Sequence, residues 1–262
     1  MHDPLTRRRT NVLGAQIDIV NWNEALDRVS AWARARESRI VCICNVHSTV
    51  TATQDARFQH VVEQCDMATP DGAPVAWMLR RLGHHGQARI NGPDLMWRYC
   101  AEAARRGDAI YLYGGAQETL DALVVRLTEA FPGLRLAGVE SPPFRTLSEG
   151  EDDSTVERIN ASGAGVVFVS LGCPKQELWM ASHRGRVRAV MIGVGAAFDY
   201  HAGKIKRAPV WMQHAGLEWL HRLASEPRRL WRRYLVTNTL FVVGASRQLL
   251  AGGSRAGGAG CD

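Results

Sequence analysis

Short, nearly continuous apolar runs alternate along the chain with longer segments of helical pattern. The apolar runs predict strands at residues 39–46, 109–115, 134–141, 165–172 and 189–195. The longer segments predict helices at residues 23–37, 93–107, 117–133 and 174–185. Strands without polar alternation are typical of a parallel sheet that is covered on both faces. The pattern therefore predicts an α/β fold, a Rossmann-like parallel sheet core with helices on both faces.

The pattern changes near residue 209. The pattern of residues 209–250 predicts two helices broken near Pro227. Five arginines lie within residues 222–233, and three tryptophans are interleaved along the segment. No stretch reaches the roughly 18–20 apolar residues that span a bilayer. We expect an α/β core at 1–208, a basic, aromatic helical appendage at 209–250 that associates with a membrane, and a disordered tail at 251–262.

Composition narrows this picture only a little. The chain has 262 residues and is 46% hydrophobic, which is enough for a sizeable core. Its net charge of +6 favours an anionic partner without separating a nucleotide from a nucleic acid or a membrane. The acidic segment 148–154 predicts a solvated loop, because Asp152-Asp153 does not form the DxD pattern of a metal site.

Polar residues follow two early apolar segments, where ligands bind in an open parallel sheet. Asn45 lies at the end of the apolar segment 39–46 and His47 follows it, and the Asn45 amide can donate to and accept from a ligand hydroxyl. The alternative is that Asn45 caps a turn. Asp71 stands in Pro70-Asp71-Gly72, which is an ordinary turn signal or, in this semi-buried context, a general base on a short loop.

Two later strand ends have a similar character. Gly114 lies between a strand and a helix, where its backbone can approach a phosphate or a sugar, although a simple tight turn explains it equally well. Gln176 and Glu177 lie on the first turn of the helix at 174–185. Gln176 can donate to a sugar hydroxyl, and the alternative is ordinary capping by Glu177.

The arginines of the appendage also have two interpretations. Arg222, Arg229 and Arg232 share one helical stripe if the helix continues through Pro227. Such a stripe can bind a diphosphate without a metal, or it can be a solvated helix face.

Six segments carry a resemblance to a known family when they are taken together. They are "TPDGAPVAW" (69–77), "RINGPDLMW" (89–97), "YLYGG" (111–115), "LGCPKQELWM" (171–180), "GVGAAFDYHAGKIKRAPVW" (193–211) and "GLEWLHRLASEPRRLWRRY" (216–234). The chain resembles the WecG/TagA/CpsF glycosyltransferases over about residues 10–240. The resemblance implies inverting transfer of a hexose, without metal or cofactor, from a UDP-sugar to a polyprenyl-diphosphate-linked sugar. It also implies peripheral association with the cytoplasmic face of the bacterial inner membrane, an anionic surface.

The same resemblance implies roles for individual residues. Asp71 is expected to be the general base, Asn45 and Gln176 to lie near the transferred sugar, and Arg89 to line the pocket. The three arginines that match the family's C-terminal pattern are expected to close over the donor diphosphate: Arg222, Arg229 and Arg232. Ile43 stands where the family often has Thr, so a hydroxyl role there is absent or moved.

The sequence leaves alternatives for the donor sugar, the oligomeric state and the class of protein. We expect UDP-glucose and exopolysaccharide biosynthesis, with UDP-N-acetylmannosamine or its uronic acid as the alternative donors. A homo-oligomer that dissociates on the membrane is a family-like state. A non-catalytic membrane-docking protein is the rival class. An NAD-dependent enzyme would need the GxGxxG motif that the chain lacks, and we expect no nucleic-acid partner because the basic residues lie beside an apolar helix.

Overall fold

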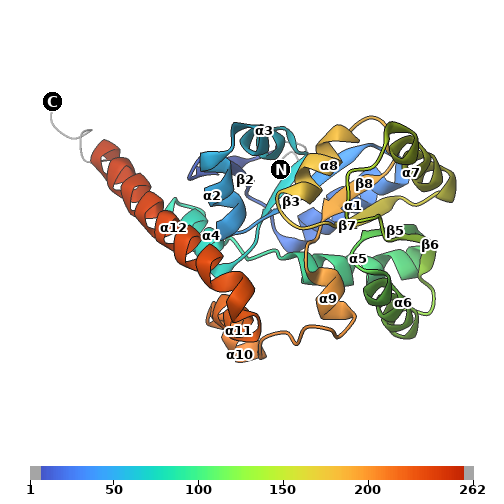
Figure 1. The fold of residues 1–262 in the computed structure, drawn as a ribbon. Coiled ribbons are helices and arrows are strands. Elements are labelled where there is room, and N and C mark those ends of the chain that lie inside the picture. The colour runs from blue at the N-terminus through green and yellow to red at the C-terminus, as the bar shows by residue number, and fades with distance from the viewer. Residues whose placement is uncertain (1–6, 257–262) are drawn as a thin grey trace.

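The computed structural model describes residues 7–256 and contains the expected parallel sheet (Figure 1). Its strands are β3 (Arg39–Cys44), β4 (Met67–Pro70), β5 (Ala109–Gly114), β6 (Arg135–Glu140), β7 (Val166–Ser170) and β8 (Val190–Gly193). They lie in the order β4-β3-β8-β7-β5-β6, and each neighbouring pair is parallel. Five of these strands were predicted. The missed strand, β4, is the one that leads into Asp71.

Helices cover both faces of the sheet, as predicted. One core packs α1 (Trp22–Arg34), α5 (Gly92–Arg106), α6 (Gln117–Ala130) and α9 (Ala197–His201) against the sheet. The other packs α2 (Val46–Gln54), α3 (Ala56–Gln64), α4 (Ala73–Arg81), α7 (Glu149–Ser162) and α8 (Lys175–Ser182) against the opposite face. Alternate residues of β3 enter the two cores, Val41 one and Cys42 the other, which explains why the strand is apolar from Ile40 to Cys44.

An antiparallel hairpin that the sequence pattern did not reveal precedes the sheet. It consists of β1 (Arg9–Val12) and β2 (Ala15–Asp18), and its Val12 and Ile17 enter the same core as α2 and α3. Four-residue strands give too short an alternation to stand out from the flanking polar residues.

The acidic segment 148–154 is not the loop that we expected. Ser148 caps α7, and the Glu151 carboxylate accepts a hydrogen bond from the Ser148 backbone N–H, which completes a capping box. Acidic side chains in a first turn also interact favourably with the positive end of the helix dipole. The acids therefore mark the start of a helix.

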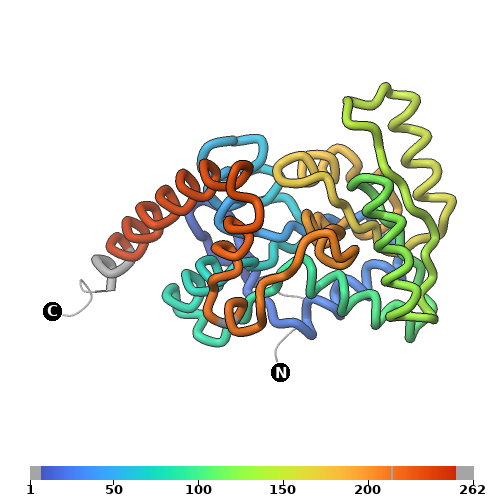
Figure 2. Tube along the Cα trace, turned by 60° about the horizontal axis from the view of Figure 1, so that its bottom comes forward, coloured from blue at the N-terminus to red at the C-terminus, as the bar shows by residue number. Residues whose placement is uncertain are grey.

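The C-terminal region forms α10 (Val210–His214), α11 (Glu218–Ser225) and α12 (Pro227–Ala256). The predicted break at Pro227 is confirmed, but three helices form instead of the two expected, because the chain also turns at Gly216, where φ is 73°. Figures 1 and 2 both show α12 passing beside α2 and extending beyond the rest of the molecule. α12 runs to Ala256, so it enters the segment 251–262 for which we expected a disordered tail. Residues 257–262 lie outside the described residues.

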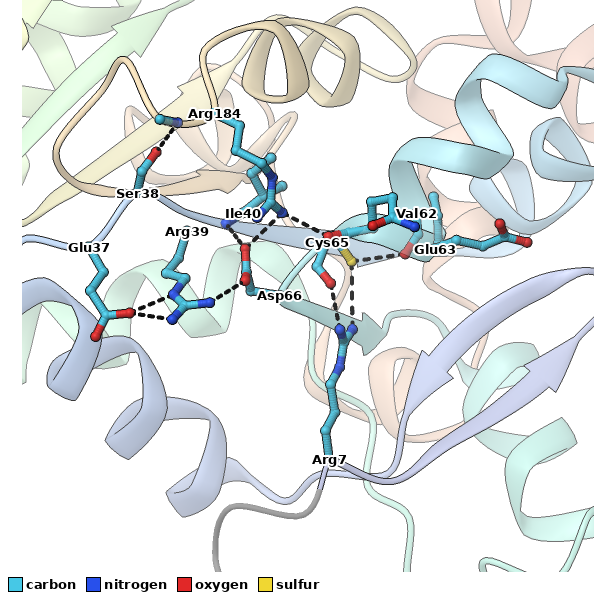
Figure 3. A network of polar contacts seen from close by, with 12 residues as sticks. Arg7, Glu37, Ser38, Arg39, Ile40, Val62, Glu63, Cys65, Asp66 and Arg184 are labelled. Carbon is cyan, nitrogen blue, oxygen red and sulfur yellow. Dashed lines mark hydrogen bonds and ion pairs between the residues drawn. The ribbon is translucent and has the colours of Figure 1, made fainter.

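A polar network ties the amino ends of β3 and β4 to the loop after α8 (Figure 3). Asp66 accepts hydrogen bonds from Arg39 Nη1 at 2.8 Å, Arg184 Nη2 at 2.9 Å and the Ile40 backbone N–H at 2.8 Å. This network stabilises the edge of the sheet opposite to the strand ends that carry Asn45 and Asp71.

Candidate active site

Asp71 is the first residue after β4, at the carboxyl edge of the sheet. β4 pairs with β3 so that Pro70 lies opposite Cys44, and the Asp71 N–H donates to the Cys44 carbonyl at 2.9 Å. The next residue, Gly72, has a φ of 82° and is the N-cap of α4, so the chain turns sharply at a position that favours glycine. The Asp71 side chain is left one-fifth exposed at the strand end.

Arg89 lies beside Asp71 because its segment runs along the end of β4. The Ile90 N–H donates to the Pro70 carbonyl at 2.9 Å, and the Thr69 hydroxyl donates to the Ile90 carbonyl at 3.1 Å. These bonds place Arg89 Nε 3.5 Å from Asp71 Oδ1. The structure thus brings together two of the residues that the sequence predicted for the site.

The surroundings of Asp71 suit a general base. Burial raises the pKa of its carboxyl, the Arg89 guanidinium opposes this rise, and the Glu218 carboxylate adds to it. A carboxylate whose pKa is raised takes a proton more readily than one in water.

Asn45 lies at the end of β3, next to the strand that carries Asp71. It is the N-cap of α2, and its Oδ1 accepts from the Ser48 backbone N–H at 3.1 Å. This is the capping role of the alternative interpretation. Because the cap uses Oδ1, the Nδ2 amide stays available to donate to a ligand, and a role near the sugar remains a prediction.

Gln176 is at the start of α8 and is almost fully buried. Its Oε1 accepts from the Gly195 N–H at 3.1 Å, and its Nε2 donates to Glu177 Oε1 at 2.9 Å. Glu177 is itself buried, and burial raises the pKa of its carboxyl. The Gln176 side chain therefore packs against the end of β8, and its direct contact with a sugar remains a prediction.

Gly114 is required by the sheet itself. It ends β5 with a φ of 106°, and a Cβ added there would lie 2.5 Å from the Ser170 carbonyl oxygen. Close approach between β5 and β7 therefore explains the glycine, which is nearer to the tight-turn alternative. Its approach to a ligand is a prediction that no contact tests.

The three predicted arginines do not share one stripe, because the helix breaks between them. Arg222 lies on α11, where its Nη1 donates to the Tyr200 hydroxyl at 2.9 Å. Arg229 lies on α12 and pairs with Glu226, and Arg232 lies exposed one turn further on. The stripe was conditional on a helix through Pro227, and the proline begins a new helix instead. Their role at the donor diphosphate remains a prediction.

Three charged residues connected to Arg89 through ion pairs were missed by the sequence reasoning. Glu218 of α11 accepts from Arg89 Nη2 and lies 3.4 Å from Arg207 Nε. Arg207 in turn forms a two-point ion pair with Asp94, whose Oδ2 lies 3.0 Å from Arg207 Nη2. All three stand inside the family segments, which was the available signal, but their pairing joins positions far apart in the chain.

A groove of about 460 Å³ lies elsewhere, between α2, α12 and the β1–β2 hairpin. Its lining includes Leu13, Val50, Val243 and Arg247, and none of the predicted site residues lines it. Within residues 7–256, no group of three His, Cys, Asp or Glu side chains has the arrangement of a metal site. Metal independence remains a prediction for an assay to test.

The carboxyl edge thus combines a buried carboxylate, arginines and polar strand ends on an α/β sheet, a combination typical of an enzyme that binds a charged ligand. Residues 10–255 match the family described as "Glycosyl transferase WecG/TagA/CpsF family". The chain belongs to this family and is a glycosyltransferase.

A curated relative narrows the comparison. It is the N-acetylglucosaminyldiphosphoundecaprenol N-acetyl-beta-D-mannosaminyltransferase of Bacillus spizizenii, 34% identical over 185 residues, which cover 70% of this chain and 70% of the relative. The relative's name specifies transfer of N-acetylmannosamine to a lipid-linked sugar. The expectation of UDP-glucose and exopolysaccharide finds no support in it, and the alternative donor, UDP-N-acetylmannosamine, is closer.

Proposed function

We propose that the protein transfers N-acetylmannosamine from UDP-N-acetylmannosamine to a polyprenyl-diphosphate-linked N-acetylglucosamine, with inversion and without a metal. The observation that carries the proposal is the environment of Asp71. This carboxylate is largely buried at a strand end beside Arg89, and burial raises its pKa. The curated relative supports the choice of donor and acceptor.

In this proposal Asp71 takes the proton from the acceptor hydroxyl. The acceptor oxygen then forms a bond to the anomeric carbon on the face opposite UDP, and the bond from that carbon to the UDP oxygen breaks. UDP leaves with the electron pair of the broken bond. Asn45, Gln176 and Gly114 position the sugar, and Arg222, Arg229 and Arg232 stabilise the growing charge on the diphosphate.

Surface chemistry supports the proposal that α10–α12 dock on an anionic membrane. Among the described residues, no helix has both the length and the hydrophobicity to cross a bilayer. The three helices nevertheless expose large apolar side chains: Val210, Trp211, Trp219, Leu220, Trp231, Leu235, Val236, Leu240, Val242, Val243 and Leu250. Exposed arginines, Arg228, Arg229 and Arg232, accompany them. Apolar and basic side chains together favour an interfacial position, on the cytoplasmic face where the acceptor's lipid lies.

The experiment is a donor panel in the presence of EDTA. The purified protein is incubated with a short polyprenyl-diphosphate-N-acetylglucosamine and, in separate reactions, UDP-N-acetylmannosamine, its uronic acid and UDP-glucose. UDP release and the mass of the lipid product are measured, with the acceptor omitted as the control. We expect release only with UDP-N-acetylmannosamine. Release with UDP-glucose alone would overturn the donor, and release only without EDTA would overturn metal independence.

A further inference from the structure

Glu218 forms ion pairs that connect the appendage to the core. It is the first residue of α11, and its side chain is only 18% exposed. One carboxylate oxygen accepts from Arg89 Nη2, and the other lies 3.4 Å from Arg207 Nε. The two arginines come from separate core segments, one before α5 and one after α9. A single carboxylate of the appendage therefore pairs with two arginines of the core.

A second ion pair holds Arg207 in position. Arg207 pairs at two points with Asp94, which lies in the first turn of α5. Asp94 also accepts from Asn91 Nδ2 at 2.6 Å. Although burial acts to raise the pKa of Asp94, the hydrogen bonds from Arg207 and Asn91 lower it, so the carboxylate stays charged and Arg207 stays in place.

Backbone packing brings the appendage to the same point. Gly216, in the turn before α11, has a φ of 73°, and a Cβ added there would lie 2.7 Å from the Ala73 Cβ. Ala73 is two residues after Asp71, at the start of α4. The turn and Glu218 thus reach the strand end that carries Asp71.

Arg89 connects Glu218 to Asp71, the candidate base. Its Nη2 serves Glu218, while its Nε lies 3.5 Å from Asp71 Oδ1, too far for a hydrogen bond. That Nε is buried and, within the described part of the chain, has no hydrogen-bond partner. The guanidinium is therefore divided between two carboxylates and satisfies Asp71 incompletely.

We propose that Glu218 is a positioning residue that makes Asp71 a stronger base when α11 is packed against the core. Glu218 draws the Arg89 guanidinium toward itself and places a second negative charge near Asp71. When α11 lifts away, Arg89 is free to close on Asp71 and hold it as a weak, ion-paired carboxylate. The charged groups that face Asp71 are Arg89, Glu218 and Asp94, with Arg207 beyond them. This inference rests on the proposed role of Asp71 as the base.

The test compares the full-length protein with Glu218→Gln, which keeps the shape of the side chain and removes its charge. The dependence of kcat/KM on pH is measured with the best donor and acceptor, because its acid limb reports ionisation of the base in the free enzyme. For Glu218→Gln we expect the acid limb to move to lower pH. At neutral pH we expect kcat/KM to fall on the order of tenfold, part of the 10²–10⁴-fold that a positioned base contributes.

Three further variants serve as controls for this comparison. Glu129→Gln removes an exposed charge from α6 and should leave the profile unchanged. Glu218→Asp should recover part of the wild-type profile, because the charge returns. Asp71→Asn separates the two proposals: if it retains near-normal turnover, the role of Asp71 fails. If Asp71→Asn is inactive while Glu218→Gln keeps the wild-type acid limb, whatever its rate, the inference about Glu218 is overturned and the role of Asp71 stands.

Discussion

Arg89 Nε lies 3.5 Å from Asp71 Oδ1, a separation at which the two side chains attract one another without a hydrogen bond. Attraction of this kind stabilises the charged carboxylate, whereas burial destabilises it, and burial has the larger effect on the pKa of Asp71. The candidate base is therefore held between a cation that weakens it and an environment that strengthens it.

Removing the cation should shift this balance. For Arg89→Gln we expect the acid limb of the kcat/KM profile to move to higher pH, because the pKa of Asp71 rises further when its nearest positive charge is lost. The shift is opposite in sign to the one expected for Glu218→Gln. Arg126→Gln, an exposed arginine on α6, is the matched control. A shift of Arg89→Gln to lower pH would contradict this account of the pair.

Glu177 offers a test on stability rather than on rate. Burial raises the pKa of Glu177, so the folded state holds this proton more tightly than the unfolded chain. The stability contributed by the carboxyl is complete below its unfolded pKa and is lost as pH rises through the raised folded pKa. The measurement is the difference between the urea unfolding midpoints of the wild type and Glu177→Gln. We expect this difference, wild type minus variant, to decrease as pH rises from about 4 to about 8. A difference that is constant or increases with pH would argue against a buried, proton-binding Glu177.

The predicted arginines should separate into two kinds when they are truncated. Arg222→Ala removes a hydrogen bond to Tyr200 and a guanidinium that stacks 5.4 Å from that ring, and should cost about 1–3 kcal/mol of stability. Arg232→Ala, at an exposed position, should change stability by less than about 0.5 kcal/mol. Both should raise KM for the donor if they contact its diphosphate. Unchanged donor kinetics in Arg232→Ala would remove that residue from the site.

The apolar side of α12 predicts membrane binding. Leu235 and Val242 are each 62% exposed, and changing both to Glu should weaken binding to anionic vesicles about tenfold or more. Val125→Glu on α6, at a position 55% exposed, is the control for added charge. Raised salt should weaken wild-type binding, because attraction between exposed charges is screened. Equal vesicle binding by the double variant and the wild type would point to a different contact surface.

The sequence predicted most of the sheet because four of its strands, β3, β5, β7 and β8, are buried on both faces and are apolar along nearly all of their length. β4 was missed because Thr69 and Pro70 resemble the start of a turn, although Pro70 is the last residue of an edge strand. The acidic start of α7 was also missed, although Ser148 and Glu151 stand at the spacing of a capping box.

The candidate site was predictable only in part, and for a physical reason. The semi-buried turn around Asp71 allowed a general base, and the resemblance to the family favoured that interpretation. Only the resemblance pointed to Arg89. The contact between Arg89 and Glu218 joins residues 129 positions apart, and no local pattern encodes such a pair. Nor could local pattern show that Gln176 turns inward to Glu177 and Gly195, because its burial depends on the end of β8.

The central claim is that Asp71 is the general base, and the most direct measurement is the turnover of Asp71→Asn with the donor and acceptor identified in the panel. We expect kcat to fall at least about 10²-fold, with an unfolding temperature within about 4 °C of the wild type. Asp27→Asn, at an exposed position on α1, should be fully active. Turnover of Asp71→Asn within a few-fold of the wild type would contradict the claim.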